Sequence, residues 1–204
     1  MRSAFSLSIA IGTVIVVAGI CQADGPNAEL IGKLEAAIDA APDANDAVKA
    51  FAKTTLLPHC SNTVFVTAVK EHNAKKMSLD DIKKTDQQWV DAEEELPIHK
   101  ELMENACAKE IHKIAGSHSA IGEVFVMDNQ GANVGQNALT SDYWQGDEPK
   151  WQNSFNGGKG GVDISKETLD KSTNVVDQKV SLPIIDADGK VIGAVCWGVK
   201  VSSL

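Results

Sequence analysis

The hydrophobic pattern of the chain changes once, near residues 117–121, and this change constrains the fold more than any other feature. Before it, apolar residues recur every three or four positions, as on one face of an amphipathic helix. After it, apolar residues gather in short runs separated by turn residues, as in strands joined by hairpins. Helices followed by strands in separate blocks predict an α+β fold, with long N-terminal helices packed beside an antiparallel sheet.

Proline and capping residues set the bounds of the predicted helices. Pro58 ends the first and Pro97 begins the fourth, while Asn62 and Ser78 cap the second and the third. The expected helices cover residues 27–57 with a break at Pro42, 63–75, 79–91 and 97–114. Together they form a predicted helical region, 24–118.

The rest of the chain, 119–204, is predicted to form the sheet. The expected strands are 123–127, 132–136, 175–185 and 190–201, with a shorter strand near 160–164. Turn residues at 128–131 and 186–189 separate two pairs of them. The long stretch 140–161 is rich in glycine, polar residues and tryptophan, and it is expected to be a loop.

Residues 1–23 have the pattern of a secretory signal peptide. Arg2 is followed by an apolar run from Ser8 to Ile20, and small residues near Ala23 predict cleavage there. The run is shorter than the roughly 18–20 apolar residues of a spanning helix. A retained anchor and a lipoprotein attached at Cys21 remain as alternatives, although Ile20 is large for the position before a lipid site. We therefore expect export to the periplasm.

The charge balance excludes one class of partner. The formal net charge is -9 and the pI is about 5.0, whereas nucleic-acid binding needs a clustered basic face. Arg2 is the only arginine, so the mature chain has no guanidinium clamp for a carboxylate. An acidic ligand would have to be held by lysine, by side-chain amide or aromatic donors, or by backbone N–H groups.

Four stretches of the sheet region carry a family resemblance: 123–151 (EVFVMDNQGANVGQNALTSDYWQGDEPKW), 169–173 (LDKST), 179–184 (KVSLPI) and 188–193 (DGKVIG). They resemble the PDC/Cache sensor domains, which are extracytoplasmic PAS-like domains of bacterial sensor kinases and chemoreceptors. The resemblance implies a small ligand, often an organic acid, between the sheet and its long loop. Family members are commonly followed by a membrane helix, whereas this sequence ends at Leu204. We expect a stand-alone exported form that signals through a separate membrane sensor protein.

The resemblance also implies the ligand-binding residues. They are Asp142, Tyr143, Trp144 and Trp151 in the long loop, with Lys179 as the counter-charge for a carboxylate. Aromatic rings with a polar atom suit a pocket wall because they exclude water and orient a ligand. Two alternatives remain open: the rings can be ordinary core, and Lys179 can be a solvated lysine on an outer strand face.

The cysteines and histidines predict structure more than chemistry. In an oxidising compartment Cys60 and Cys107, on neighbouring predicted helices, are expected to form a disulfide. Cys196 is expected to be a small buried thiol. No zinc, calcium or catalytic motif has the required spacing, so we expect no metal, no cofactor and no enzyme. The predicted function is a periplasmic small-molecule-binding sensor-type domain, and the alternatives are a structural or interaction module without a ligand and, third, an enzyme or redox carrier.

Overall fold

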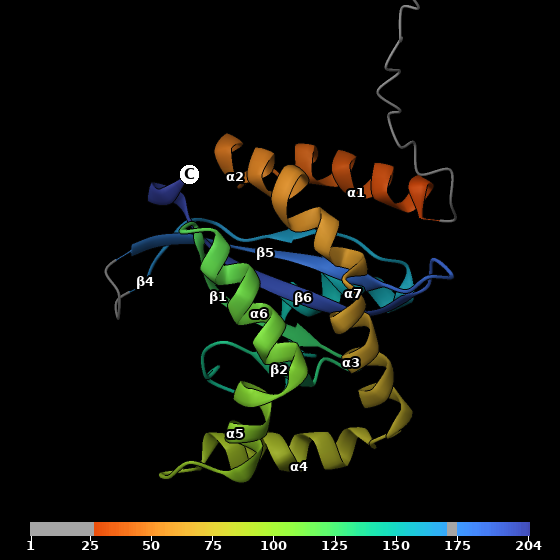
Figure 1. Ribbon diagram of the computed structural model, residues 1–204, viewed down its shortest axis with the longest axis vertical. Helices are drawn as coiled ribbons and strands as arrows, with labels where there is room; N and C mark the ends of the chain where they lie inside the picture. The colour runs from red at the N-terminus through yellow and green to blue at the C-terminus, as the bar shows by residue number, and fades with distance from the viewer. Residues whose placement is uncertain (1–26, 171–174) are drawn as a thin grey trace, which may run out of the picture.

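The computed structural model describes residues 27–170 and 175–204, so the predicted signal peptide, residues 1–23, lies outside the described part. Helices come first and an antiparallel sheet follows (Figure 1). In spatial order the sheet consists of β2 (Asn133–Gln136), β1 (Ile121–Met127), β6 (Val191–Lys200), β5 (Val175–Ile185) and β3 (Asp163–Ile164), and β4 (Thr168–Asp170) also pairs with β5. This arrangement confirms the predicted α+β class. None of the described helices is long and apolar enough to cross a membrane.

The helices begin close to the predicted residues. They are α1 (Ala28–Ala40), α2 (Asp46–Phe51), α3 (Thr63–Ala74), α4 (Leu79–Val90), α5 (Pro97–Glu104), α6 (Ala106–Ser117) and α7 (Pro149–Phe155), with a π-helical turn, η1 (Ala52–Leu56), and a 3₁₀ turn, η2 (Leu57–Ser61), after α2. Asn62 Oδ1 accepts a hydrogen bond from Val64 N at 2.9 Å, and Ser78 Oγ accepts one from Asp81 N at 3.1 Å. The two predicted caps are therefore confirmed.

The single helix expected over 97–114 is wrong, because the chain forms two helices that meet at Asn105. Asn105 has an extended backbone, with ψ 177°, and its Oδ1 accepts a hydrogen bond from Ala108 N at 2.9 Å. Its Nδ2 donates to Val134 O at 2.8 Å. One side chain thus caps α6 and anchors the start of that helix to β2.

The strands are β1 (Ile121–Met127), β2 (Asn133–Gln136), β3 (Asp163–Ile164), β4 (Thr168–Asp170), β5 (Val175–Ile185) and β6 (Val191–Lys200). Every predicted strand is present, and β4 was not predicted. The stretch expected to be a loop contains α7, which begins at Pro149. A helix of seven residues depends on packing for its stability, and Trp151 supplies that packing against the sheet.

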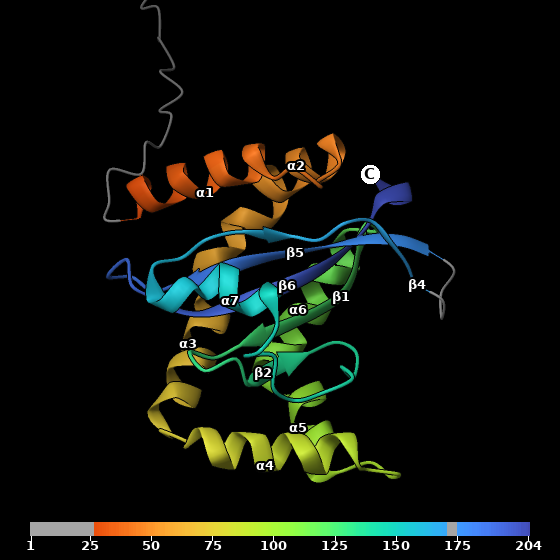
Figure 2. The same ribbon diagram turned by 180° about the vertical axis from the view of Figure 1, so that it is seen from behind.

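The two faces of the sheet are covered differently. Figure 1 shows α3 and α6 in front of the sheet, and Figure 2 shows α7 on the opposite face. The first face carries the main core, which includes Val126, Leu182 and Trp197. The second face, which we call the α7 face, packs Trp151 against Phe125, Met127, Ala194 and Cys196.

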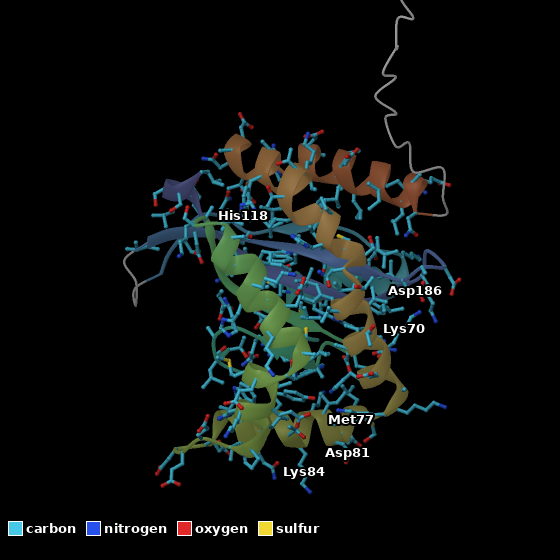
Figure 3. The ribbon with its side chains drawn as sticks, in the orientation of Figure 1. Lys70, Met77, Asp81, Lys84, His118 and Asp186 are labelled. Carbon is cyan, nitrogen blue, oxygen red and sulfur yellow. The ribbon has the colours of Figure 1, made fainter. Side chains whose placement is uncertain are left out.

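The turn between β5 and β6 is tied to α3. Asp186 Oδ1 accepts hydrogen bonds from Asp188 N and Lys190 N, both at 3.0 Å, as expected for a hairpin turn. Asp186 Oδ2 lies 3.1 Å from Lys70 Nζ, and Figure 3 shows these two side chains next to each other.

Cys60 and Cys107 lie over different strands of the sheet. Cys60 lies in η2, which packs on β5, while Cys107 lies against Gly135 of β2, where a Cβ on the glycine would be 2.7 Å from the Cys107 Cβ. The turn that carries Cys60 also contacts α6, because Asn62 Nδ2 donates a hydrogen bond to Glu110 Oε1 at 3.1 Å. The two cysteines nevertheless form no bond with each other. The expected Cys60–Cys107 disulfide is absent, and both residues are free buried thiols, as is Cys196.

We expect the three thiols to be unreactive in the native protein. Burial raises the pKa of Cys60 and of Cys107 to about 12, and that of Cys196 to about 11. Because the thiolate is the reactive form, a thiol reagent at neutral pH should label none of them before unfolding. In denaturant without reductant it should label all three. A single labelled thiol would instead indicate that Cys60 and Cys107 are oxidised.

Candidate functional site

A β-bulge turns two amide side chains of β2 to the same face of the sheet. The β1–β2 pairing matches Phe125 with Gln136 and Met127 with Asn133, with a register shift between Val126 and Met127. In a regular strand, residues 133 and 136 would point to opposite faces. The extra residue of the bulge restores Asn133 to the α7 face, where Gln136 also lies.

Gln136 begins a row of paired residues that crosses the sheet. The partners along this row are Gln136 of β2, Phe125 of β1, Cys196 of β6 and Ser181 of β5. We call these four residues the central row. All four are buried. At the usual strand spacing, Gln136 and Ser181 are about 14 Å apart.

Both ends of the central row carry unused hydrogen-bonding capacity. Gln136 Nε2 and Ser181 Oγ are buried and have no hydrogen-bond partner among the described residues, and the same holds for Asn133 Oδ1. Buried polar groups are normally paired, and leaving one unpaired costs about 1–3 kcal/mol. The row therefore presents donors and acceptors that a bound small molecule or water can use.

Helix α7 and the residues before it close the row from above. Lys150 Nζ lies 5.4 Å from the centroid of the Phe125 ring, 3.0 Å from Gln145 Oε1 and 2.8 Å from Glu148 Oε2. Trp151 packs on the same face, and its Nε1 donates a hydrogen bond to Asp128 O at 3.0 Å. The lining is thus aromatic in its middle, with one half-buried cation above the ring.

Lys179 lies on the α7 face, as the sequence predicts for the side of β5 that carries Ser181. Its Nζ is 2.9 Å from Glu123 Oε2 and 3.0 Å from Asp177 Oδ2. Burial lowers the pKa of this ammonium, but the Glu123 and Asp177 carboxylates outweigh burial, so the pKa is raised and the charge is retained. A ligand carboxylate at Lys179 would compete with two carboxylates of the chain itself.

Tyr143 lies at the edge of the sheet, packed between β2 and the helices α4 and α5. It is 1% exposed and belongs to a second core cluster with Trp89 and Leu102. Its Oη lies 3.5 Å from His72 Nε2, and His72 Nδ1 lies 2.9 Å from Asp128 Oδ2. Burial, with the nearby carboxylate of Asp128 as a second cause, raises the pKa of Tyr143, which keeps the phenol protonated.

Asp142 and Trp144 flank this buried ring. Trp144 Nε1 donates a hydrogen bond to Gln130 O at 2.8 Å, and Lys83 Nζ lies 4.8 Å from the ring centroid. Asp142 accepts a hydrogen bond from Gln145 Nε2. Burial raises the pKa of the Asp142 carboxyl, and that bond opposes the rise.

The structure therefore divides the predicted site residues into two groups. Trp151 and Lys179 lie on the α7 face, whereas Tyr143 and Trp144 lie beside α4. Sequence reasoning missed Asn133, Gln136, Ser181 and Lys150. A polar residue such as Gln136 at a predicted buried strand position was the one available signal. The bulge that turns Asn133 to the same face as Gln136 has no sequence signature in the chain.

Within residues 27–170 and 175–204, no three His, Cys, Asp or Glu side chains are grouped so that they could hold a metal ion.

No family model and no curated protein matches the sequence. Solved structures do match. They include the sensor domain of the histidine kinase DctB from V. cholerae (12% identity, TM-score 0.42, covering 86% of this chain and 57% of that one). They also include the ligand-binding domain of the Campylobacter jejuni chemoreceptor Tlp3 in complex with L-norvaline (15% identity, TM-score 0.39, covering 86% of this chain and 60% of that one). A third is the ligand-binding domain of the Pseudomonas aeruginosa PAO1 amino acid chemoreceptor PctC in complex with GABA (10% identity, TM-score 0.34, covering 72% of this chain and 60% of that one).

The chain spans 57–60% of the length of these three structures. At such identities and TM-scores, the comparison describes a distant likeness of fold. The solved structures that this chain is similar to are sensor domains of the PDC/Cache type, the family that its sequence resembles.

Proposed function

We propose that this chain is a small-molecule-binding sensor-type domain of the periplasm, and that its ligand lies along the central row beneath α7. The observation that supports this most strongly is the pair of unpartnered buried atoms, Gln136 Nε2 and Ser181 Oγ, at the two ends of the row. A protein that only needed a packed sheet would lose nothing by placing apolar side chains there. A ligand that uses both atoms would offset their desolvation.

The proposed ligand is a small organic acid. Its carboxylate would be held by the Lys150 ammonium above Phe125 and by the N–H groups of Gln136 Nε2, because the mature chain has no arginine for this purpose. A second polar group would reach Ser181 Oγ. Gln136 and Ser181 are about 14 Å apart across the row, so a ligand that reaches both atoms would have to carry several carbons between its polar groups. Norvaline and GABA, which two of the matched proteins bind, each carry a carboxylate and belong in a test panel.

The proposal extends to the partner. We expect a separate membrane sensor protein to receive the signal, as the family resemblance implies. The alternative function, a structural or interaction module without a ligand, is favoured by one observation: Tyr143 is packed as core and does not line an open pocket.

A thermal-shift screen of residues 24–204 against small organic acids, amino acids and amines tests the proposal. A ligand that binds only the folded protein stabilises it by mass action, by about 2.7 kcal/mol when the ligand is at a hundred times its Kd. This stabilisation raises the Tm. We expect a concentration-dependent shift with one class of acid. The absence of a shift across the panel, in a folded protein, would favour the module without a ligand.

The location of the ligand is tested by Gln136→Leu, which keeps the approximate volume and removes the amide. This variant should stay folded, because the Nε2 group that it removes has no partner and the Oε1 atom that it removes accepts only two long hydrogen bonds, from Asn133 Nδ2 at 3.2 Å and from Thr140 Oγ1 at 3.4 Å. It should lose most of the ligand-induced shift. Gln88→Leu is the matched control, because Gln88 is exposed on α4, and it should keep the full shift. Equal shifts in the two variants would show that the ligand does not use the central row.

A further inference from the structure

Helix α4 buries few of its side chains against the rest of the molecule. Its two buried residues, Ile82 and Trp89, lie outside the main core. They belong to the second cluster, whose other buried members are Leu102, Ala132 and Tyr143. Figures 1 and 2 both show α4 at the end of the molecule beyond β2, away from α1 and α2. Elements that bury few apolar side chains open at lower free-energy cost than core elements.

The segment 140–145, which we call the strap, is bonded directly to α4. Asp86 Oδ1 accepts hydrogen bonds from Tyr143 N at 2.8 Å and from Trp144 N at 2.9 Å. Trp89 Nε1 donates to Thr140 O at 3.0 Å. Hydrogen bonds to a charged acceptor are among the stronger ones, so Asp86 holds the strap to α4 at two consecutive residues.

The other side of the strap is bonded to the central row through Asn133. Asn133 Nδ2 donates to Thr140 Oγ1 at 2.9 Å and lies 3.2 Å from Gln136 Oε1. Thr140 thus contacts Asn133 through its hydroxyl and Trp89 through its carbonyl. A continuous chain of hydrogen bonds runs from Gln136 in the row, through Asn133 and Thr140, to Trp89 on α4.

One residue of the connection that precedes α4 has a left-handed backbone conformation. Lys76 has φ 50°, and of the non-glycine residues that the structure describes only Asn156 shares this left-handed conformation. Such strained positions gather at switch regions. Just after Lys76, the chain is bonded to the turn between β1 and β2. Gln130 Nε2 in that turn donates a hydrogen bond to Met77 O at 2.8 Å. Figure 3 shows Met77 at the end of α4 that follows this connection.

We propose that α4 and the strap move as one unit against the sheet, and that α4 thereby reports the state of the central row. The second half of this statement rests on the proposed function. A ligand that engages Gln136 and Asn133 changes the hydrogen bonds offered to Thr140, and Thr140 passes the change to Trp89. Asp86 is a positioning residue in this device, because it holds the strap to the helix without touching the row.

Hydrogen–deuterium exchange of residues 24–204, without any ligand, tests the coupling. In Asp86→Ala, amides of α4 and of the strap should exchange faster together, by about tenfold or more, while β5 and β6 keep their protection. Asp86→Asn retains an acceptor oxygen and should restore most of the protection. Asp91→Ala, an exposed carboxylate at the end of the same helix, is the control and should leave the strap unchanged.

The decisive variant is Asn133→Ala, since this side chain bonds the strap and Gln136 and makes no hydrogen bond to α4. It should accelerate exchange across α4 as well as in the strap. Acceleration confined to residues near 133 and 140 would overturn the coupling. If exchange is coupled but no acid shifts the Tm, the proposed function fails and the coupling stands. If an acid binds at the row while exchange changes stay local, the coupling alone fails.

Discussion

Replacement of Tyr143 by alanine should lower the free energy of unfolding by about 3–5 kcal/mol, the cost usual for removing a large buried ring. Tyr143 is 1% exposed and packs with Trp89, at 6.0 Å between ring centroids, and with Leu102 and Ile82. The cavity would open between α4, α5 and β2. Urea unfolding followed by tryptophan fluorescence measures the loss.

Tyr143→Phe is the control for this result. It keeps the ring and removes only the hydroxyl, which lies 3.5 Å from His72 Nε2. The expected loss is about 0.5–1.5 kcal/mol, as for one buried hydrogen bond. A Tyr143→Ala variant within 1 kcal/mol of wild type would show that the ring is not part of the core.

Gly131→Ala should also be strongly destabilising, by roughly 2–4 kcal/mol. Gly131 has φ 87°, which costs an L residue energy, and a Cβ there would lie 2.5 Å from the backbone Cα and N of Gly146. Because both neighbours are backbone atoms, no side chain can move aside to relieve the contact. The strap would have to leave the edge of β2, where Gln145 N now donates to Gly131 O at 2.8 Å.

Gly32→Ala provides the matched control, since a Cβ at Gly32 meets no atom within 4 Å and the residue lies inside α1. Alanine should stabilise that helix by about 0.5–1 kcal/mol. Comparison of the two denaturation midpoints separates steric cost from the general effect of losing a glycine. Equal midpoints for the two variants would contradict the close approach of Gly131 and Gly146.

The fold could be predicted well because its signals are local. Hydrophobic periods of three to four residues identified the helices, and short apolar runs between turn residues identified the strands. Asn62 and Ser78 marked helix starts through their own side chains. The break at Asn105 was missed for a tertiary reason. Asn105 ends α5 and caps α6 partly because its Nδ2 bonds Val134 O on β2, a partner 29 residues away.

The site could be predicted less well, because its geometry depends on strand register. The bulge at Met127 decides that Asn133 shares a face with Gln136, and the pairing across four strands decides that Gln136 and Ser181 belong to one row. Helix α7, which carries Lys150, is too short to show a periodic pattern. The expected Cys60–Cys107 disulfide is also absent, because contact between two elements, here through Asn62 and Glu110, does not bring every pair of their side chains together.

A crystal structure of residues 24–204, grown with the acid that gives the largest thermal shift, tests whether the central row binds a ligand. We expect density for that molecule beneath α7, with its carboxylate within hydrogen-bonding distance of Gln136 Nε2 and Lys150 Nζ and its other end toward Ser181. Density for the acid at another place, or a central row in which Gln136 Nε2 and Ser181 Oγ are both paired with protein atoms, would contradict it.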